Sequence, residues 1–202
     1  MEYEKKIEEY PKSISLEGTE IIFDQMKKAV CKINIGNKKG IGFFCKIPFP
    51  DSFHLLPVLI TDSYLLNIDK VIEGQIIQFT MEDKEDKLSF KISSDINRIT
   101  YISKQYNITI IKIKENDKLN SISFLEIDEQ IFTSNLNKEI DIYLLHYPEL
   151  KKSDISIGKI TKIKNDNSKF CHICNSSIGS LGGPLINVNN CKVIGMHKGK
   201  DE

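Results

Sequence analysis

The sequence predicts an all-β protein built in two halves, with one short helix near its start. Two observations support this fold class: short β-rich runs separated by turn residues dominate the chain after its first 30 residues, and helical spacing occurs only before them. A third observation is that a polar, breaker-rich segment, Lys114–Leu125, divides these runs into two sets. Many short strands with turns between them are typical of a β-barrel or a β-sandwich.

The helix is predicted in the segment 1–28. Thr19 is a good N-cap residue, and the apolar residues that follow it recur at roughly helical spacing. These apolar residues are Ile21, Ile22, Met26, Ala29 and Val30.

The first set of runs alternates between two faces, as strands with one buried face do. Cys31 shares a face with Ile33 and Ile35, and Ile41, Phe43, Cys45 and Ile47 share one in the next run. Residues 37–40 (Asn-Lys-Lys-Gly) between these runs predict a hairpin turn. The strands predicted in this half are Val30–Ile35, Ile41–Ile47, Leu55–Thr61, Gln75–Thr80, Leu88–Ser93 and Ile108–Ile113.

The second set follows the polar crossover, which we place near residue 118. It gives the halves 29–117 and 118–202. The strands predicted here are Ile140–His146, Ile155–Ile163, Lys169–Cys174, Leu185–Val188 and Lys192–His197.

Charge and composition exclude several classes of function. The chain has 28 basic and 28 acidic residues, so its net charge is zero, and Arg98 is its one arginine. A general binder of nucleic acid or of an anionic membrane needs a surplus of positive charge, so we expect neither partner. The charge run 82–87 reads as a solvated hairpin, and His54 as a surface residue.

The amino terminus lacks the apolar run of a secretory signal, and no stretch is long enough to span a membrane. Five cysteines at irregular spacing do not indicate a secreted disulfide framework, so we expect a reduced, cytoplasmic protein. Cys171 and Cys174 have the C-x-x-C spacing of some zinc sites. They would point to opposite faces of a strand, so we predict structural cysteines and no metal or cofactor.

Five segments, in order, carry a resemblance to a known family. Residues 179–185 (Gly-Ser-Leu-Gly-Gly-Pro-Leu) resemble the G-D-S-G-G-P-L nucleophile loop of trypsin-like serine proteases, and 193–197 (Val-Ile-Gly-Met-His) resemble the strand after it. Upstream, 40–44 resembles the family's G-T-G-F strand, 58–66 its V-L-T-x-x-H-V-L segment, and 107–111 its D-I-A-L-L strand. The resemblance implies two antiparallel β-barrels of the chymotrypsin type, with an active site between them.

The same resemblance places a different residue at each position of the catalytic triad. Tyr64 stands at the histidine position, Asn107 at the aspartate position and Leu181 at the serine position. Leucine has no nucleophilic atom, a tyrosine hydroxyl is a poor proton acceptor at neutral pH, and asparagine has no charge to stabilise an imidazolium. We therefore predict an inactive serine protease homologue.

Parts of the site that depend on the backbone are expected to remain. Gly179, Ser180 and Leu181 form a loop resembling the oxyanion hole, whose donors are backbone N–H groups. Gly195, Met196 and His197 are the candidate peptide-binding strand. Ser180 next to the lost position is a surrogate nucleophile only if its side chain reaches the substrate, and we expect it to point to the other side of the loop.

The chain ends soon after His197, where family members continue with another strand and a helix, so we expect a second barrel that is incomplete at its C-terminal end. An open sheet edge is a template for pairing with another chain. The predicted function is a pseudoprotease that acts as a protein-interaction or regulatory module, with an unknown protein or peptide partner bound by strand addition. The alternatives are a weak or altered serine-type hydrolase and a gene copy without a selected role.

Overall fold

A computed structural model describes residues 13–65, 76–81, 89–93, 100–117, 119, 121–129, 140–164 and 168–199. Three features discussed above lie outside these ranges: the segment 1–12, the charge run 82–87 and the boundary residue 118. Within the described ranges no helix is both long and apolar enough to cross a membrane.

The described chain consists of one α-helix and thirteen β-strands, with two short 3₁₀ turns, η2 and η3. The elements of the first half are α1 (Leu16–Ala29), β1 (Val30–Ile35), β2 (Lys38–Pro48), β3 (Leu55–Asp62), β4 (Ile76–Met81), β5 (Ser89–Ser93), β6 (Thr100–Ser103), β7 (Ile108–Lys112) and η2 (Glu115–Asp117). Those that follow are β8 (Leu125–Glu126), β9 (Asp141–His146), η3 (Pro148–Leu150), β10 (Asp154–Ile163), β11 (Phe170–His172), β12 (Pro184–Asn187) and β13 (Val193–Met196).

The N-cap of helix α1 lies four residues earlier than predicted. Ser15 is the N-cap, and its hydroxyl accepts a hydrogen bond from the Gly18 N–H at 3.1 Å. Thr19 lies within the first turns, where its hydroxyl donates to the Ser15 carbonyl at 3.0 Å. The helix buries Ile22, Met26 and Ala29.

The first half is a sheet in the order β5-β4-β1-β2-β3-β7-β6, and β8 pairs with β2 in parallel. The β1–β2 turn consists of Gly36 and Asn37, since Ile35 already pairs with Lys38. The sequence placed this turn later, at residues 37–40. Gly36 has a φ of 56°, which a tight turn requires and glycine adopts without strain. The strands β6 and β8 have no counterpart in the sequence prediction.

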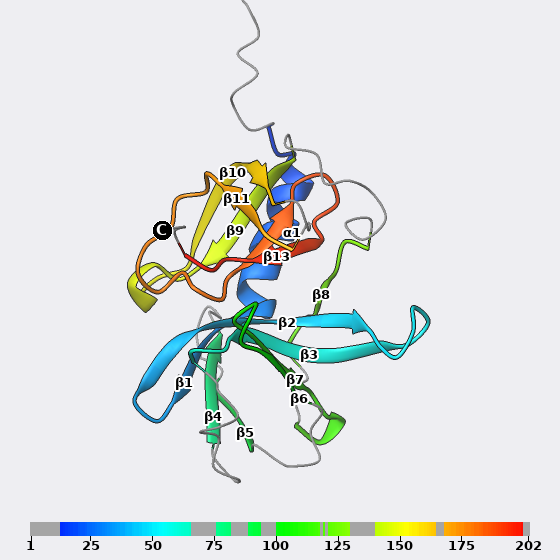
Figure 1. Cartoon of the computed structure of the whole chain (residues 1–202), viewed down its shortest axis with the longest axis vertical. Coiled ribbons are helices and arrows are strands. Elements are labelled where there is room, and N and C mark those ends of the chain that lie inside the picture. Colours follow the sequence, from blue (N-terminus) through cyan, green and yellow to red (C-terminus); the bar gives the residue numbers. More distant parts are fainter. Residues whose placement is uncertain are drawn as a thin grey trace, which may run out of the picture.

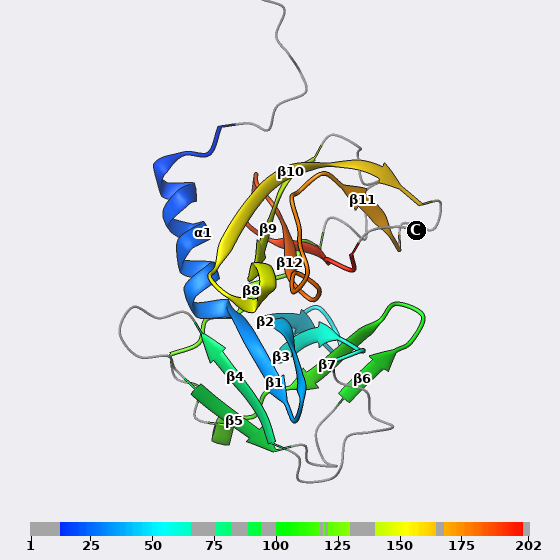
Figure 2. The same cartoon turned by 90° about the vertical axis from the view of Figure 1, so that its left-hand side faces the viewer.

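The second half is a sheet in the order β11-β10-β9-β12-β13. Figures 1 and 2 show it curled above the first sheet, with α1 running along one side. β11 ends at His172, so Cys174 lies outside the strand that was predicted to contain it.

Three hydrophobic clusters hold these parts together. The interior of the first half contains the face of Cys31, Ile33 and Ile35, and the second half has its own cluster around Ile142 and Leu144. The third cluster joins α1 to both sheets, and includes the predicted face of Ile41, Phe43 and Cys45 together with Tyr143, Leu145 and Tyr147.

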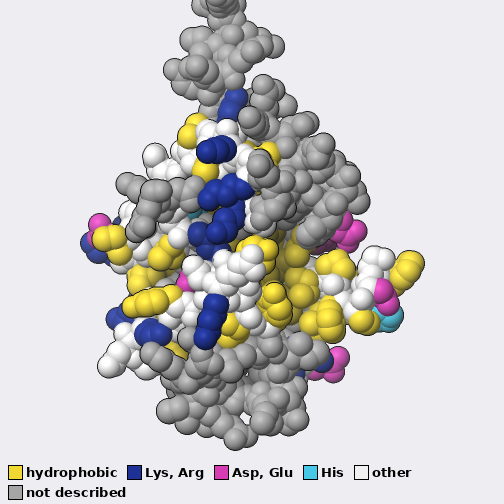
Figure 3. All heavy atoms as spheres, viewed as in Figure 1, with side chains coloured by type: hydrophobic (Ala, Val, Ile, Leu, Met, Phe, Trp, Pro, Cys, Tyr) yellow, Lys and Arg dark blue, Asp and Glu magenta, His cyan; other side chains and the backbone are white. Residues whose placement is uncertain are grey.

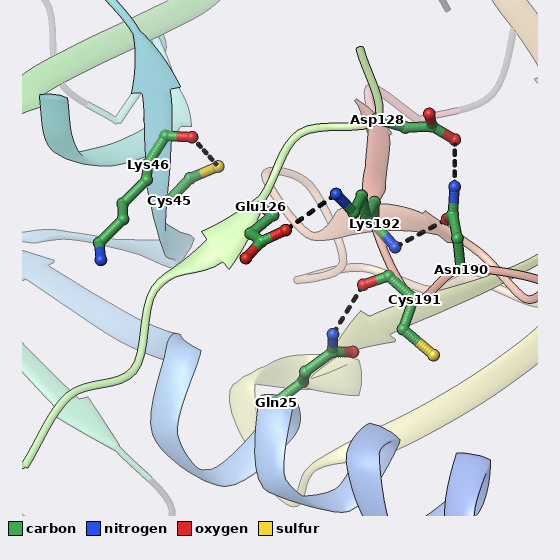
Figure 4. Close-up of polar contacts among 8 residues, drawn as sticks. All are labelled: Gln25, Cys45, Lys46, Glu126, Asp128, Asn190, Cys191 and Lys192. Carbon is green, nitrogen blue, oxygen red and sulfur yellow. Dashed lines mark hydrogen bonds and ion pairs between the residues drawn. The ribbon is translucent and has the colours of Figure 1, made fainter. Parts of the chain in front are cut away.

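Polar contacts add to this junction on the side of β8 and α1 (Figure 4). The Gln25 amide donates to the Cys191 carbonyl at 2.8 Å, and Lys192 forms an ion pair with Glu126 at 2.9 Å. The Asp128 carboxylate accepts a hydrogen bond from Asn190 at 2.9 Å. These contacts attach the crossover segment and the helix to the second half.

The predicted all-β class with one short N-terminal helix is confirmed.

Candidate functional site

The loop that carries Leu181 is pressed against the first half of the molecule. Gly182 has a φ of 91°, and a Cβ atom there would lie 2.4 Å from the Ile41 carbonyl oxygen. The N–H of Gly182 donates to the His197 carbonyl at 3.0 Å. Only glycine fits here, because the two main-chain segments approach each other so closely. This close contact holds the loop between β2 and the end of β13.

Asn107 and Tyr64 come together at the edge of the same junction. The Asn107 carbonyl accepts a hydrogen bond from the Ser63 N–H at 3.1 Å, and Asp62 accepts one from the Tyr64 N–H at 2.7 Å. The Tyr64 side chain, however, is 81% exposed, and the Lys38 ammonium lies 4.9 Å from its ring centre. The phenol therefore points into solvent.

Lys198 lies between these segments. Its ammonium donates a hydrogen bond to the main-chain carbonyl oxygen of Asn107 and lies 3.8 Å from the Asp62 carboxylate. The next residue, Gly199, approaches Leu181: a Cβ atom on Gly199 would lie 3.2 Å from a Leu181 methyl carbon. The structure thus brings the neighbourhoods of Tyr64, Asn107 and Leu181 together around a cation.

Burial lowers the pKa of Lys198 to about 8, although the Asp62 carboxylate acts in the opposite direction, and the charge of Lys169 lowers it further. Near neutral pH Lys198 is therefore still mostly charged. Sequence reasoning missed Lys198 and Asp62, because neither stands at a position whose chemistry the resemblance assigns.

The loop resembling the oxyanion hole has two backbone donors that are not used within the chain. Neither the N–H of Gly179 nor that of Leu181 donates a hydrogen bond to an acceptor among the described residues. Gly179 has a φ of 93°, a backbone conformation that favours glycine. Donors of this kind are what an incoming carbonyl or carboxylate oxygen needs.

Ser180, the middle residue of that loop, faces the protein interior. It is fully buried, its Oγ lies 2.7 Å from Nδ1 of His146, and it accepts a hydrogen bond from the Ser177 N–H at 3.0 Å. A serine paired with a histidine resembles part of a catalytic site. This hydroxyl is closed off from any substrate, and it fixes the shape of the loop.

Two further histidines lie beside this pair. Nε2 of His172 lies 3.0 Å from Nδ1 of His197, and Nδ1 of His172 accepts a hydrogen bond from the Cys174 N–H at 3.2 Å. Burial lowers the pKa of His146 and of His172. It lowers that of His197 to about 4, with added repulsion from the other two histidines. His146 and His197 are buried and His172 is half-buried, and the three rings form a group that is neutral at pH 7, which the sequence did not reveal.

The candidate peptide-binding strand lies at the end of the second sheet. His197 exchanges hydrogen bonds with Gly182 and Gly183, and Gly195 pairs with Leu185. Since the polar groups of an antiparallel strand alternate in direction, the N–H and C=O of Met196 face away from β12. The Phe170 ring covers Gly195, where a Cβ would lie 2.8 Å from it.

The buried cysteines have unreactive thiols. Burial raises the pKa of Cys45 and of Cys174 to about 12 and that of Cys31 also upward, so these thiols stay protonated. Across the part of the chain that the structure describes, no group of three or more His, Cys, Asp or Glu side chains is placed to hold a metal ion.

Comparisons with known proteins place this geometry in a fold. The chain is similar to the serine endoprotease from Yersinia pestis (12% identity, TM-score 0.62), and covers 58% of that protein with 94% of its own length. It is also similar to Rv3671c from M. tuberculosis in an inactive mutant form (15%, TM-score 0.61, 96% and 85% covered) and to Deg5 (14%, TM-score 0.61, 94% and 89% covered). No family model matches the chain, and comparison with curated proteins gives no match in sequence.

Identities of this size show the fold alone. The structural neighbours are trypsin-like serine proteases, and the predicted architecture of chymotrypsin type is confirmed. The Yersinia pestis endoprotease is longer than this chain, which spans 58% of it.

Proposed function

We propose that the protein is a catalytically inactive member of this protease fold that binds a protein or peptide partner as an interaction or regulatory module. One observation carries the proposal: the three segments assigned to a triad meet, and none of them supplies the chemistry. Leu181 presents an alkyl side chain, Asn107 has an uncharged amide in place of a carboxylate, and the Tyr64 ring is turned into solvent.

Hydrolase activity would need a nucleophile that a substrate can reach, and Ser180 does not meet this need. The Ser180 hydroxyl, which does contact a histidine, is fully buried. A serine nucleophile must approach the substrate carbonyl to within about 3–3.5 Å before attack. Reaching that distance from Ser180 would require the loop to open and to break its hydrogen bonds to His146 and Ser177.

Groups that recognise an extended backbone are nevertheless available. The Gly179 and Leu181 N–H groups have no acceptor in the described chain, and the edge of β13 at Met196 faces away from β12. A peptide that adds to a sheet edge gains main-chain hydrogen bonds irrespective of its sequence. These features support peptide binding without cleavage.

The test compares Met196→Pro with Met196→Ala. Both shorten or alter the side chain, but proline also removes the outward N–H, which an edge strand tolerates. Peptides selected by display against the full chain should bind the Ala variant as they bind the unmodified protein, and should bind the Pro variant at least about tenfold more weakly. Equal binding to both variants, with both folded by circular dichroism, would contradict binding at this edge.

A further inference from the structure

Residues 197–199, which follow β13, lie across the junction between the two halves, and we call them the 197–199 segment. Lys198 in the middle of this segment donates a hydrogen bond to the main-chain carbonyl of Asn107. Gly199 lies against Leu181, since a Cβ atom on this glycine would lie 3.2 Å from a Leu181 methyl carbon. The 197–199 segment therefore contacts both the first half of the molecule and the loop that resembles the oxyanion hole.

Lys198 is the cation beside a carboxylate that is almost buried. The side chain of Asp62 is 12% exposed, and it accepts a hydrogen bond from the Tyr64 N–H at 2.7 Å. A buried carboxylate is costly to leave without a cation. The Lys198 ammonium lies 3.8 Å from this carboxylate, whereas a hydrogen bond from nitrogen to oxygen is ordinarily about 2.7–3.2 Å long. Asp62 therefore needs a cation, and Lys198 supplies one without close contact.

The hold of the site on Lys198 is weak. The side chain is 34% exposed, and its ammonium is carried on a flexible stem of four carbons. Burial lowers the pKa of Lys198 to about 8 although Asp62 acts in the opposite direction, so burial costs the ammonium more than the carboxylate returns. Lys198 is therefore able to turn into water once another cation takes its place beside Asp62.

We infer that the 197–199 segment competes with the peptide partner for this site, and that the partner displaces Lys198 with a lysine or arginine side chain of its own that binds Asp62. This inference rests on the proposed function and adds the chemical class of the peptide. A peptide whose carbonyl oxygens reach the N–H groups of Gly179 and Leu181 passes beside Leu181, which the 197–199 segment contacts.

The charge at Asp62 explains why the displacing side chain is basic. A peptide that moves Lys198 without supplying a cation leaves the Asp62 carboxylate uncompensated, which is strongly unfavourable for a buried charge. An acidic side chain would add repulsion to this cost. An ammonium or guanidinium group within hydrogen-bond distance of Asp62 replaces the long contact of Lys198 with a closer, charge-assisted one.

The surroundings of Asp62 favour apolar residues next to that basic side chain. Tyr64, which follows Asp62 by two residues, is exposed, and so are Leu181 and Ile178 on the loop that carries the free N–H groups. Contact with the apolar side chains of a peptide would remove these three from water. The peptide class is therefore a basic residue with apolar neighbours.

The experiment measures fluorescence anisotropy of labelled peptides with the full chain. Three twelve-residue peptides of Ser and Thr carry Val on either side of a central residue, which is lysine, norleucine or glutamate. We expect the lysine peptide to bind at least about tenfold more tightly than the norleucine peptide, which has the same stem without the charge. Figure 3 shows a column of basic side chains down the middle of one face, so general charge attraction would instead favour the glutamate peptide.

Two lysine variants test the competition. Lys198→Met keeps an unbranched side chain but removes the competing ammonium, and it should tighten binding of the lysine peptide at least about tenfold. Lys192→Met is the control, because Lys192 also pairs with a carboxylate, that of Glu126 at 2.9 Å, on the side of β8 and α1. It should change the affinity less than about twofold. An equal effect of the two variants would overturn the inference.

A third variant tests the role of the carboxylate. Asp62→Asn removes the charge but keeps an oxygen that can accept the Tyr64 N–H. In this variant the lysine peptide should bind within about twofold of the norleucine peptide. A preference for lysine that persists without the Asp62 charge would contradict the assignment of this residue.

The remaining outcomes separate this inference from the proposed function. If the norleucine peptide binds the unmodified chain as tightly as the lysine peptide, and both depend on the Met196 edge, peptide binding stands and the basic class is wrong. Tighter binding of the glutamate peptide would also show the class to be wrong. If no peptide, including those selected by display, binds the folded chain or its Lys198→Met variant, both proposals fail.

Discussion

Acid should destabilise this protein through its buried His197. The pKa of His197 falls from an ordinary 6.5 to about 4 in the folded state, chiefly because the ring is buried. Between these two values the unfolded chain binds a proton that the folded protein does not. The free energy of unfolding is therefore fully present above pH 6.5 and declines as the pH falls toward 4.

The magnitude follows from the size of this change. For one group with this pKa shift, each pH unit from 6.5 down to 4 removes about 1.4 kcal/mol from the free energy of unfolding. His197 therefore accounts for a loss of up to about 3 kcal/mol, which partial solvation of the ring reduces toward about 2 kcal/mol. The other two histidines act in the same direction. Their charges face His197 from β9 and β11, so protonating one ring discourages protonating the next.

A matched substitution isolates the contribution of His197. The amide oxygen of His197→Asn can replace Nδ1 as the acceptor for His172, but the side chain does not titrate. We expect the difference in unfolding free energy between pH 7.5 and pH 4.5 to be about 2–3 kcal/mol smaller in this variant than in the unmodified protein.

The measurement is urea unfolding followed by far-ultraviolet circular dichroism, because the chain contains no tryptophan. His54→Asn serves as the control, since His54 is an exposed residue beside Asp51. It should change the pH dependence much less than His197→Asn does, because an exposed ion pair contributes little to stability. If His197→Asn loses as much stability with acid as the unmodified protein does, the buried histidine group does not have the role described.

Three further predictions test the packing of the site. Gly182→Ala should lower the free energy of unfolding by about 3 kcal/mol or more, because φ is 91° and the Cβ would meet the Ile41 carbonyl. Gly40→Ala is the control and should lower it less, since its Cβ would meet only a flexible Leu65 methyl. Equal losses for the two variants in urea unfolding would refute the argument. Ser180→Ala should cost about 1–3 kcal/mol in the same assay, since it removes the bonds to His146 and Ser177, and no loss would contradict a structural role for the hydroxyl. Brief alkylation of the native protein at pH 8, read by mass spectrometry, should modify only the two partly exposed thiols, Cys171 and Cys191. The buried thiols are those of Cys31, Cys45 and Cys174, and rapid labelling of any of them would contradict the packing described.

The fold was predictable from the sequence where side chains alternate cleanly. Cys31, Ile33 and Ile35 fill one cluster and Ile41, Phe43 and Cys45 another, as the period of two requires. The short strands β6 and β8 were missed because their sequences have little of this pattern. The helix start was misplaced because Ser15 and Thr19 are both good caps, and only the fold selects between them.

The site was less predictable, because its residues meet across the two halves. The resemblance led to the loop 179–185, but it gave no reason to connect Lys198 with Asp62 and Asn107, which are far away in sequence. The buried contacts of His146 with Ser180 and of His172 with His197 likewise depend on strand pairing. Short-range patterns do not record such pairs.

The most direct test of the central claim restores the lost chemistry. Tyr64→His, Asn107→Asp and Leu181→Ser are introduced together, alone and with Lys198→Ala, because the Lys198 ammonium binds the main-chain carbonyl of Asn107 and lies 3.8 Å from the Asp62 carboxylate, in the middle of the site to be restored. Each folded protein is then treated with a serine-directed fluorophosphonate probe and with a generic peptide substrate. The account predicts that the unmodified protein is neither labelled nor active, and that the restored chain lacking Lys198 is labelled at position 181. Labelling of a serine in the unmodified protein, with contaminating proteases excluded, would contradict it.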